Sequence, residues 1–287
     1  MITVPSAPKS RKIIGLADDA MRLKISHITT YTYSEPVHYA LQQVRLTPKS
    51  TGGQKILSWE TNIIGGKKEL EFDDQHNNHV FLVSNDPESV EITIHIEGDI
   101  ETTKSDGIIG KHGGYAPLWF FRRSTPLTNP GKQLRELVNQ LHGESVSEVV
   151  RLHELSELIA SRVAYKTGKT HAATTVEEAI EAGHGVCQDH SHIFVTACRL
   201  MGFPSRYVSG YLMMNDRVDQ DASHAWAETY IQDVGWVGFD ISNGISPDER
   251  YIRVATGLDY KDAAPISGMR VGNSEENMSV SLQVQQQ

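Results

Sequence analysis

Polar and apolar residues alternate along the first third of the chain after a polar leader. Five short segments in this region are rich in β-branched and aromatic residues, which is typical of strands: RLKISHITTYTYS, LQQVRLTP, ILSWETNII, HVFLVSN and VEITIHIEGDIE. Glycine or asparagine pairs at 52–53, 65–66 and 77–78 punctuate them as turns. The pattern predicts an N-terminal β-domain, a sandwich or barrel, over residues 22–105.

Beyond residue 128 the apolar spacing changes from two to about 3.6, as in helices. Helices are predicted after Asn129-Pro130, after the capping boxes SVSE and TTVE, and within GHGVCQDHSHIFVTACRLMG. The strand-like segments SRYVSGYL, HAWAETYI and GWVGFD follow. Helices leading into an antiparallel sheet predict an α+β domain over residues 129–272, joined to the β-domain by a linker at 106–128.

The two ends of the chain carry no core pattern. Residues 1–21 lack an apolar segment of signal-peptide length, so we expect a flexible N-terminal tail, with Met21 as a candidate start. The polar residues 273–287 predict a flexible C-terminal tail. No apolar run is long enough to predict a transmembrane helix.

Composition narrows the classes of partner. The 287 residues carry a formal charge of −9, which argues against nucleic acid or an anionic membrane as the main partner. Two cysteines are too few for a disulfide framework. Cys187 and Cys198 would lie about 16 Å apart along one helix, too far to bridge. Reduced thiols and a cytoplasmic location are therefore expected.

The position of Cys187 suggests a nucleophile. It lies in the first turn of its predicted helix, where the helix dipole and free N–H groups favour a thiolate. His224 opens one predicted strand and Asp240 closes the next, so antiparallel pairing would bring the two side chains together. Asp240 would then orient the imidazole and the helix would bring Cys187 to the other ring nitrogen.

Alternative roles for these cysteines and histidines have less support in the sequence. Cys198, in the middle of the helix on its apolar face, is expected to be core. A zinc site near Cys187 is disfavoured, because His190 and His192 would point to opposite sides of the helix and no C-x-x-C or H-E-x-x-H is present. The chain also lacks a G-x-S-x-G elbow and the glycine patterns of nucleotide sites. We therefore expect neither metal nor cofactor.

The segments GHGVCQDHSHIFVTACRLMGFPSRYVSGYL and DASHAWAETYIQDVGWVGFDISNG resemble the bacterial transglutaminase-like cysteine hydrolases, which are putative cysteine proteases of the papain-like superfamily. HITTYTYSEPV and VRLTP resemble the N-terminal β-domain of that family, and DERYIRVATGLDYKDAAPISG its C-terminal segment. The resemblance covers about residues 22–272. It implies a papain-like transglutaminase core, with helices packed on an antiparallel sheet, preceded by the β-domain.

The resemblance also implies a catalytic triad. Cys187 corresponds to the nucleophile, His224 to the general base and acid, and Asp240 to the orienting acid. The implied reaction is attack on a peptide or protein amide through a thioester, followed by hydrolysis, or by transfer to an amine as in a transglutaminase. A non-catalytic protein-binding module on the same fold is the alternative from another class, and the complete triad weighs against it.

Three details of the predicted site stay open in the sequence. The backbone N–H of Cys187 is one natural oxyanion donor, and Tyr165 or Gln188 is a candidate for the second by position alone. His190 stands where the family often has an aromatic residue, which suggests a change in pocket polarity. Ile241 stands where a proline commonly follows the aspartate.

Overall fold

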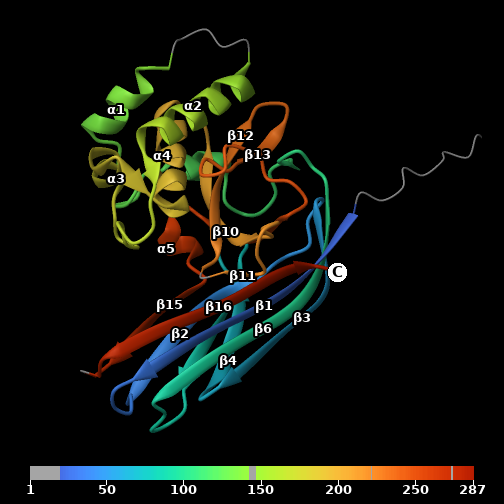
Figure 1. The fold of residues 1–287 in the computed structure, drawn as a ribbon, viewed down its shortest axis with the longest axis vertical. Coiled ribbons are helices and arrows are strands. Elements are labelled where there is room, and N and C mark those ends of the chain that lie inside the picture. Colours follow the sequence, from blue (N-terminus) through green and yellow to red (C-terminus); the bar gives the residue numbers. More distant parts are fainter. Residues whose placement is uncertain (1–19, 142–146, 221, 273) are drawn as a thin grey trace, which may run out of the picture.

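The computed structural model describes residues 20–141, 147–220, 222–272 and 274–287. The chain forms two lobes (Figure 1): a lobe of long, curved strands, and a lobe in which helices cover a second sheet. The α+β class predicted from the sequence is confirmed. Of the predicted N-terminal tail, only residues 20 and 21 are described, and they begin the first strand.

The first lobe is a sandwich of two antiparallel sheets. One sheet has the order β11-β16-β1-β6-β3 and the other the order β15-β2-β5-β4. The strands nearest the N-terminus are β1 (Ala20–Tyr33), β2 (Tyr39–Thr47), β3 (Gln54–Ile64), β4 (Gly66–Asp73), β5 (His79–Asn85) and β6 (Glu91–Thr103). Alternate residues of β1 and β6 are buried between the sheets, as a period of two requires. The charged strand β4 was not predicted from the sequence, because almost all of its residues are exposed and no buried positions alternate along it.

The C-terminal end of the chain completes this sandwich. The polar composition of 273–287 predicts a flexible tail, and this prediction is wrong for the greater part of the segment. β16 (Glu276–Gln286) pairs with β1 along its length, and β15 (Ile266–Val271) pairs with β2. Leu282 and Val284 are buried in the core shared by the two sheets. The small and polar residues at alternate positions of β16 are exposed, which lowers the average hydropathy without weakening the alternation.

The second lobe is built on the sheet β14-β10-β12-β13-β7. Its central strands β10 (Ser205–Leu212) and β12 (His224–Ile231) have the bounds that the sequence predicts, and β13 (Gly235–Phe239) ends one residue earlier. The remaining strands of this lobe and its junction are β7 (Ile108–Gly110), β8 (Ala164–Tyr165), β9 (His184–Gly185), β11 (Asp219–Gln220) and β14 (Tyr251–Gly257).

Helices cover one face of this sheet. They are α1 (Lys132–Val138), α2 (Glu148–Arg162), α3 (Val176–Ala182) and α4 (Cys187–Leu200), with the short α5 (Tyr260–Ala263) beside β14. The capping box predicted in TTVE lies one residue later at α3: Thr175 and Glu178 bond reciprocally, whereas Glu177 accepts from backbone N–H groups at the start of α1. At α2 the cap is Ser147, whose side chain accepts from the N–H of Val150; the first two residues of SVSE lie outside the described residues.

The segment 106–128 is more than a linker. β7 pairs with β13 and extends the sheet of the second lobe. The 3-10 helix η1 (Leu118–Arg122) places Phe121 against Trp236, with ring centroids 5.2 Å apart. Aromatic packing therefore fixes this crossing segment to the sheet.

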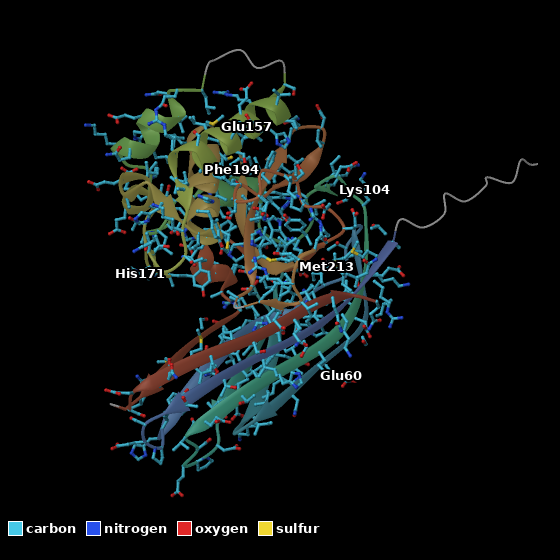
Figure 2. The ribbon with its side chains drawn as sticks, viewed as in Figure 1. Glu60, Lys104, Glu157, His171, Phe194 and Met213 are labelled. Atoms are coloured by element: carbon cyan, nitrogen blue, oxygen red, sulfur yellow. The ribbon has the colours of Figure 1, made fainter. Side chains whose placement is uncertain are left out.

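The two lobes share apolar packing. Tyr211, Met213 and Ile252 of the second lobe belong to the same buried cluster as the sandwich core. Figure 2 labels Met213 where the lobes meet, and Phe194 inside the helical part. Within the described residues, no helix is both long and apolar enough to cross a membrane.

Candidate active site

Cys187 is the first residue of α4, as the sequence predicts. It is partly buried and packs beside Tyr207 and Ala225 of the sheet. Because the first N–H groups of a helix have no intrahelical acceptor and carry partial positive charge, this position favours a thiolate. Cys198, by contrast, is fully buried on the same helix, and burial raises the pKa of its thiol to about 12.

The turn before Cys187 is shaped by Asp189. Its carboxylate accepts from the N–H of Val186 at 2.8 Å and from the hydroxyl of Thr170 at 2.7 Å. A Cβ on Gly185 would lie 2.6 Å from the Cβ of Asp189, so only glycine leaves room for this bond. Gly183 has φ 65° and ends α3 in the left-handed region. These glycines therefore set the path of the chain into the helix.

His224 and Asp240 are brought together across β12 and β13. The imidazole Nε2 lies 2.6 Å from Oδ2 of Asp240. The hairpin register that pairs Ala227 with Phe239 places Asp240 just beyond the last strand residue. A reciprocal backbone bridge between Asp240 and Ile245 then holds the following turn. Asp240 is fully buried, so this is a desolvated charge pair.

Cys187 completes the cluster. It lies close enough to His224 to contribute, with Asp240, to the pKa of the imidazole, and Cys187 and His224 line the same cavity. Burial disfavours protonation of His224, but the hydrogen bonds and charges of Asp240 and Cys187 outweigh it and raise the pKa of the imidazole to about 10. Burial likewise opposes ionisation of Asp240, yet His224, Asn243 and Tyr251 together hold its pKa below the usual value.

A cavity of about 570 Å³ opens onto this cluster. It is lined by Tyr165, Thr167, Val186, Cys187, Met214, Arg217, Gln220, Ala222, Ser223, His224, Ser242 and Asn243. The thiol and the imidazole therefore face a space large enough for part of a substrate.

Two residues around Asp240 were missed by sequence reasoning. The hydroxyl of Tyr251 donates to Oδ2 at 2.7 Å, and the Asn243 amide donates to the same oxygen at 2.7 Å. The Trp226 ring stacks beside His224, with centroids 6.3 Å apart. Asn243 follows Asp240 by three residues, a spacing typical of a turn that folds back on its aspartate. Tyr251 gave no local signal, because it arrives from β14.

The two histidines of α4 make structural hydrogen bonds. His190 lies 2.8 Å from both the Ser242 hydroxyl and the Val163 carbonyl, and it does not line the cavity. The expected effect of His190 on pocket polarity therefore finds no support in its position. His192 accepts from the N–H of Tyr260 at 3.0 Å, and burial lowers its pKa to about 3, so it is a neutral acceptor.

The candidates for a second oxyanion donor differ in position. Gln188 donates to the carbonyl of Ala172 and does not line the cavity. Tyr165 does line it, and burial followed by the nearby Cys187 and Asp240 raises the pKa of its phenol. The pairing of β8 with β9 brings Tyr165 next to the turn that leads into Cys187. Of the two, Tyr165 has the geometry for the role.

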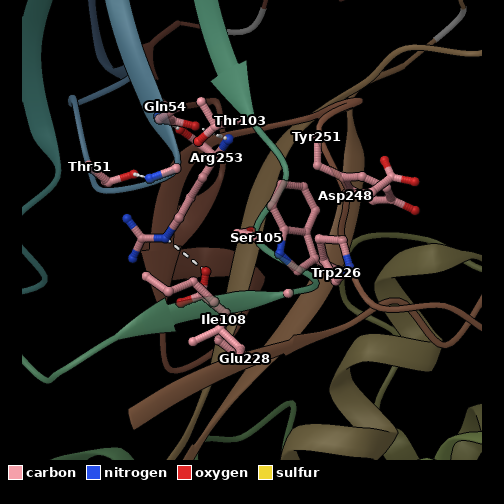
Figure 3. A pocket seen from close by; sticks show the side chains of 14 residues that line it. Thr51, Gln54, Thr103, Ser105, Ile108, Trp226, Glu228, Asp248, Tyr251 and Arg253 are labelled. Carbon is pink, nitrogen blue, oxygen red and sulfur yellow. Dashed lines mark hydrogen bonds and ion pairs between the residues drawn. The ribbon is translucent and has the colours of Figure 1, made fainter. Parts of the chain in front are cut away.

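A buried ion cluster supports the sheet behind the site. Glu228 is 1% exposed, and one of its oxygens lies 2.6 Å from a nitrogen of Arg206. The other oxygen lies 2.8 Å from Nε of Arg253 (Figure 3). Burial opposes its ionisation, but the two arginines hold its pKa below the usual value. The Arg206 guanidinium also lies 3.9 Å from the centre of the Trp236 ring. Glu228 is thus structural.

The β-domain contacts the edge of the same sheet through side-chain amides. Gln54 donates to the Arg253 carbonyl at 2.8 Å and accepts from the Arg253 N–H at 2.9 Å (Figure 3). Asn78 makes the same pair of bonds with Thr256, both at 2.8 Å. These amides satisfy the backbone of β14, which would otherwise be an open edge. β14 carries Tyr251, so the β-domain braces a strand of the candidate site.

No group of three or more histidine, cysteine, aspartate or glutamate side chains in the described ranges has the arrangement of a metal site.

Comparisons with known proteins agree with this architecture. Residues 135–241 match the Transglutaminase-like superfamily, and residues 23–101 match the bacterial transglutaminase-like N-terminal region. Uncharacterized proteins of Mycobacterium tuberculosis and Mycobacterium leprae are 28% and 24% identical over 285 and 280 residues. The alignments cover 90% of this chain and 90% of the first relative, and 92% of this chain and 98% of the second.

A solved structure shares the fold over both lobes. It is named "Putative Cysteine Protease" and comes from Cytophaga hutchinsonii; the TM-score is 0.74 at 22% identity, covering 94% of this chain and 91% of that one. The two matched regions lie in the sandwich and in the lobe that holds Cys187 and His224. The chain therefore belongs to the transglutaminase-like superfamily, with the core in residues 135–241 and the bacterial N-terminal region in residues 23–101.

Proposed function

We propose that the protein is a thiol-dependent amide hydrolase, a peptidase or amidase that works through Cys187, His224 and Asp240. The observation that carries the proposal is the hydrogen-bonded pair of His224 and Asp240 beside Cys187, in a cavity that Cys187 and His224 both line. A binding module would gain nothing from a buried carboxylate aligned with an imidazole and an accessible thiol.

These three side chains would act in sequence. Cys187 Sγ, as thiolate, attacks the carbonyl carbon of a peptide or protein amide, and the carbonyl oxygen takes up the negative charge. The N–H of Cys187 stabilises that oxygen, with the Tyr165 hydroxyl as the second donor. The imidazolium of His224 gives its proton to the departing nitrogen, the C–N bond breaks, and a thioester remains.

Water completes the cycle. Neutral His224 takes a proton from a water molecule, whose oxygen attacks the thioester carbonyl. The C–S bond breaks, the acid leaves, and the thiolate–imidazolium pair is restored. Asp240 stays ionised throughout and stabilises the imidazolium in each half of the cycle. A primary amine in place of water would give transfer instead of hydrolysis.

The test is amine or ammonia release from peptide and isopeptide libraries. Cys187→Ala should abolish turnover, whereas Cys198→Ala, a thiol of the same helix, should retain it. Turnover that survives in Cys187→Ala would refute the proposal. Adding a primary amine separates the two acceptors: a product that incorporates the amine would assign transfer, and free acid alone assigns hydrolysis.

A further inference from the structure

Two further hollows continue from the active-site cavity into the β-sandwich. The first, of about 150 Å³, shares Ala222 and Ser223 with the catalytic cavity. The second, of about 300 Å³, shares Tyr31, Ile266 and Met278 with the first. The three spaces therefore form one row, which starts at the candidate triad and runs between the two sheets.

The row exists because the sandwich is open on this side. β15 pairs with β2 alone, and the outer edge of β16 pairs with β11 only at Gln283 and Leu282. Met278 lies opposite Tyr31 in the register and so faces inward, yet it is 55% exposed. On the facing sheet Gly268 contributes no side chain to the space. The interior is thus left accessible where the two edge strands meet: the first hollow is mainly apolar, whereas the second also holds the ion pair of Arg270 and Glu276.

A buried polar atom points to a ligand in the second hollow. Gln42 lines it and is 4% exposed, and its Oε1 has no hydrogen-bond partner within the described part of the chain. A buried carbonyl oxygen without a donor is unfavourable, and native structures rarely leave one unsatisfied. A ligand N–H group would satisfy it.

We propose that these hollows are the binding groove for an extended segment of a polypeptide substrate, next to the amide that Cys187 attacks. The inference rests on the proposed function. The first hollow begins near His27 and the second reaches Tyr33, both on β1. From His27 to Tyr33 the strand advances six residues, which is roughly 20 Å at about 3.3 Å per residue. The two further hollows would therefore hold about six residues of an extended chain.

The groove matches the chemistry of a polypeptide. The free outer edge of β16 offers backbone donors and acceptors to an added strand. Side chains on one face of that strand would enter the hollows beside Tyr31 and Met278, which favours apolar residues in the first hollow and polar residues beside Arg270 and Glu276 in the second. A backbone N–H would reach Oε1 of Gln42. A small amide would fill the catalytic cavity alone and use none of these contacts.

The first test measures binding without catalysis. Fluorescent decapeptides with alternating apolar residues are titrated against Cys187→Ala protein, and anisotropy reports the Kd. Adding Met278→Trp, which fills the mouth shared by the two hollows, should weaken binding about tenfold or more. The matched control is Ile64→Trp on β3, where the native side chain is 57% exposed and lines none of the three spaces.

The outcomes separate the two proposals. Loss of binding in Met278→Trp, with binding kept in Ile64→Trp, supports the groove whether or not the peptides are cleaved. Equal binding by both variants, or no saturable binding to the Cys187→Ala parent, overturns it. Gln42→Leu should also weaken binding while the protein stays folded. For cleaved substrates, the ratio of kcat/KM for long peptides to that for short amides should fall in Met278→Trp.

Discussion

Replacing Asp240 with asparagine tests how the candidate triad is charged. The side chain keeps its size, but it can no longer stabilise an imidazolium by charge. Asp240 is fully buried, and its Oδ2 lies 2.6 Å from Nε2 of His224. The turn that holds residue 240 depends on its backbone bridge to Ile245, which the substitution leaves in place. We therefore expect a folded protein with an altered His224.

The magnitude follows from the His224 pKa. A rise from 6.5 to about 10 corresponds to roughly 5 kcal/mol at about 1.4 kcal/mol per unit. Asp240 and Cys187 share this effect, and the hydrogen bond that the imidazole donates to Asp240 is the largest favourable contribution. If Asp240 supplies half of this stabilisation of the imidazolium, the loss of its charge costs roughly 2.5 kcal/mol, which is about 10²-fold in kcat/KM. The same exchange in a serine-protease triad costs about 10⁴-fold in kcat, which gives an upper value.

The assay is the pH profile of kcat/KM. The imidazolium donates a proton to the leaving amine, so activity should persist below the pKa of His224 and fall as the pH rises through about 10. In Asp240→Asn the plateau should drop by about 10²- to 10⁴-fold and the alkaline limb should move to lower pH. The control is Asp106→Asn, whose side chain is 79% exposed.

Two results would refute this reasoning. One is an alkaline limb of the wild-type enzyme near 6.5, the ordinary value for histidine. The other is an Asp240→Asn profile with the wild-type limb and plateau. Either would mean that the buried carboxylate does not hold the imidazolium.

Three further substitutions probe the support of the site. Tyr251→Phe removes one hydrogen-bond donor to Asp240. It should lower kcat/KM about tenfold while the protein stays folded, because hydrogen bonds to charged groups are worth about 1.5–3 kcal/mol. Unchanged kinetics would exclude a positioning role for Tyr251. Glu228→Gln leaves the buried Arg206 and the partly exposed Arg253 without their shared carboxylate and should lower the free energy of unfolding in urea by about 3–5 kcal/mol; a loss below 1 kcal/mol, roughly the value of a surface pair, would contradict the buried cluster. Gln54→Leu leaves the backbone N–H and C=O of Arg253 unpaired and should lower the free energy of unfolding by about 1–3 kcal/mol. Gln54→Glu should restore only the bond from the Arg253 N–H, because a carboxylate can accept but not donate.

The sequence was most informative where local chemistry decides the structure. The strands at 205–212 and 224–231 have alternating or β-branched residues between clear turns, and the structure keeps those bounds. Placing His224 at a strand start and Asp240 at the next strand end was enough to predict that the two lie together, because hairpin neighbours must pair. The start of α4 at Cys187 followed from its glycines and apolar period.

Contacts between distant segments were not predictable in the same way. Tyr251 reaches Asp240 only because β14 pairs with β10, and no local pattern encodes that pairing. β16 was read as a tail from its polar composition, although Met278, Val280 and Leu282 alternate with small polar residues as a strand requires. Its partner β1 lies about 250 residues earlier in the chain, beyond the reach of any short-range pattern.

The most direct measurement of the central claim is the pH dependence of alkylation at the two cysteines. Iodoacetamide at near-neutral pH, read by peptide mass spectrometry, should modify Cys187 and leave the buried Cys198 unmodified until the protein is denatured. His224→Ala should slow the reaction of Cys187 at that pH by about tenfold or more, because the imidazolium that stabilises the thiolate is gone. Equal labelling of both thiols, or the same Cys187 profile with and without His224, would contradict the account.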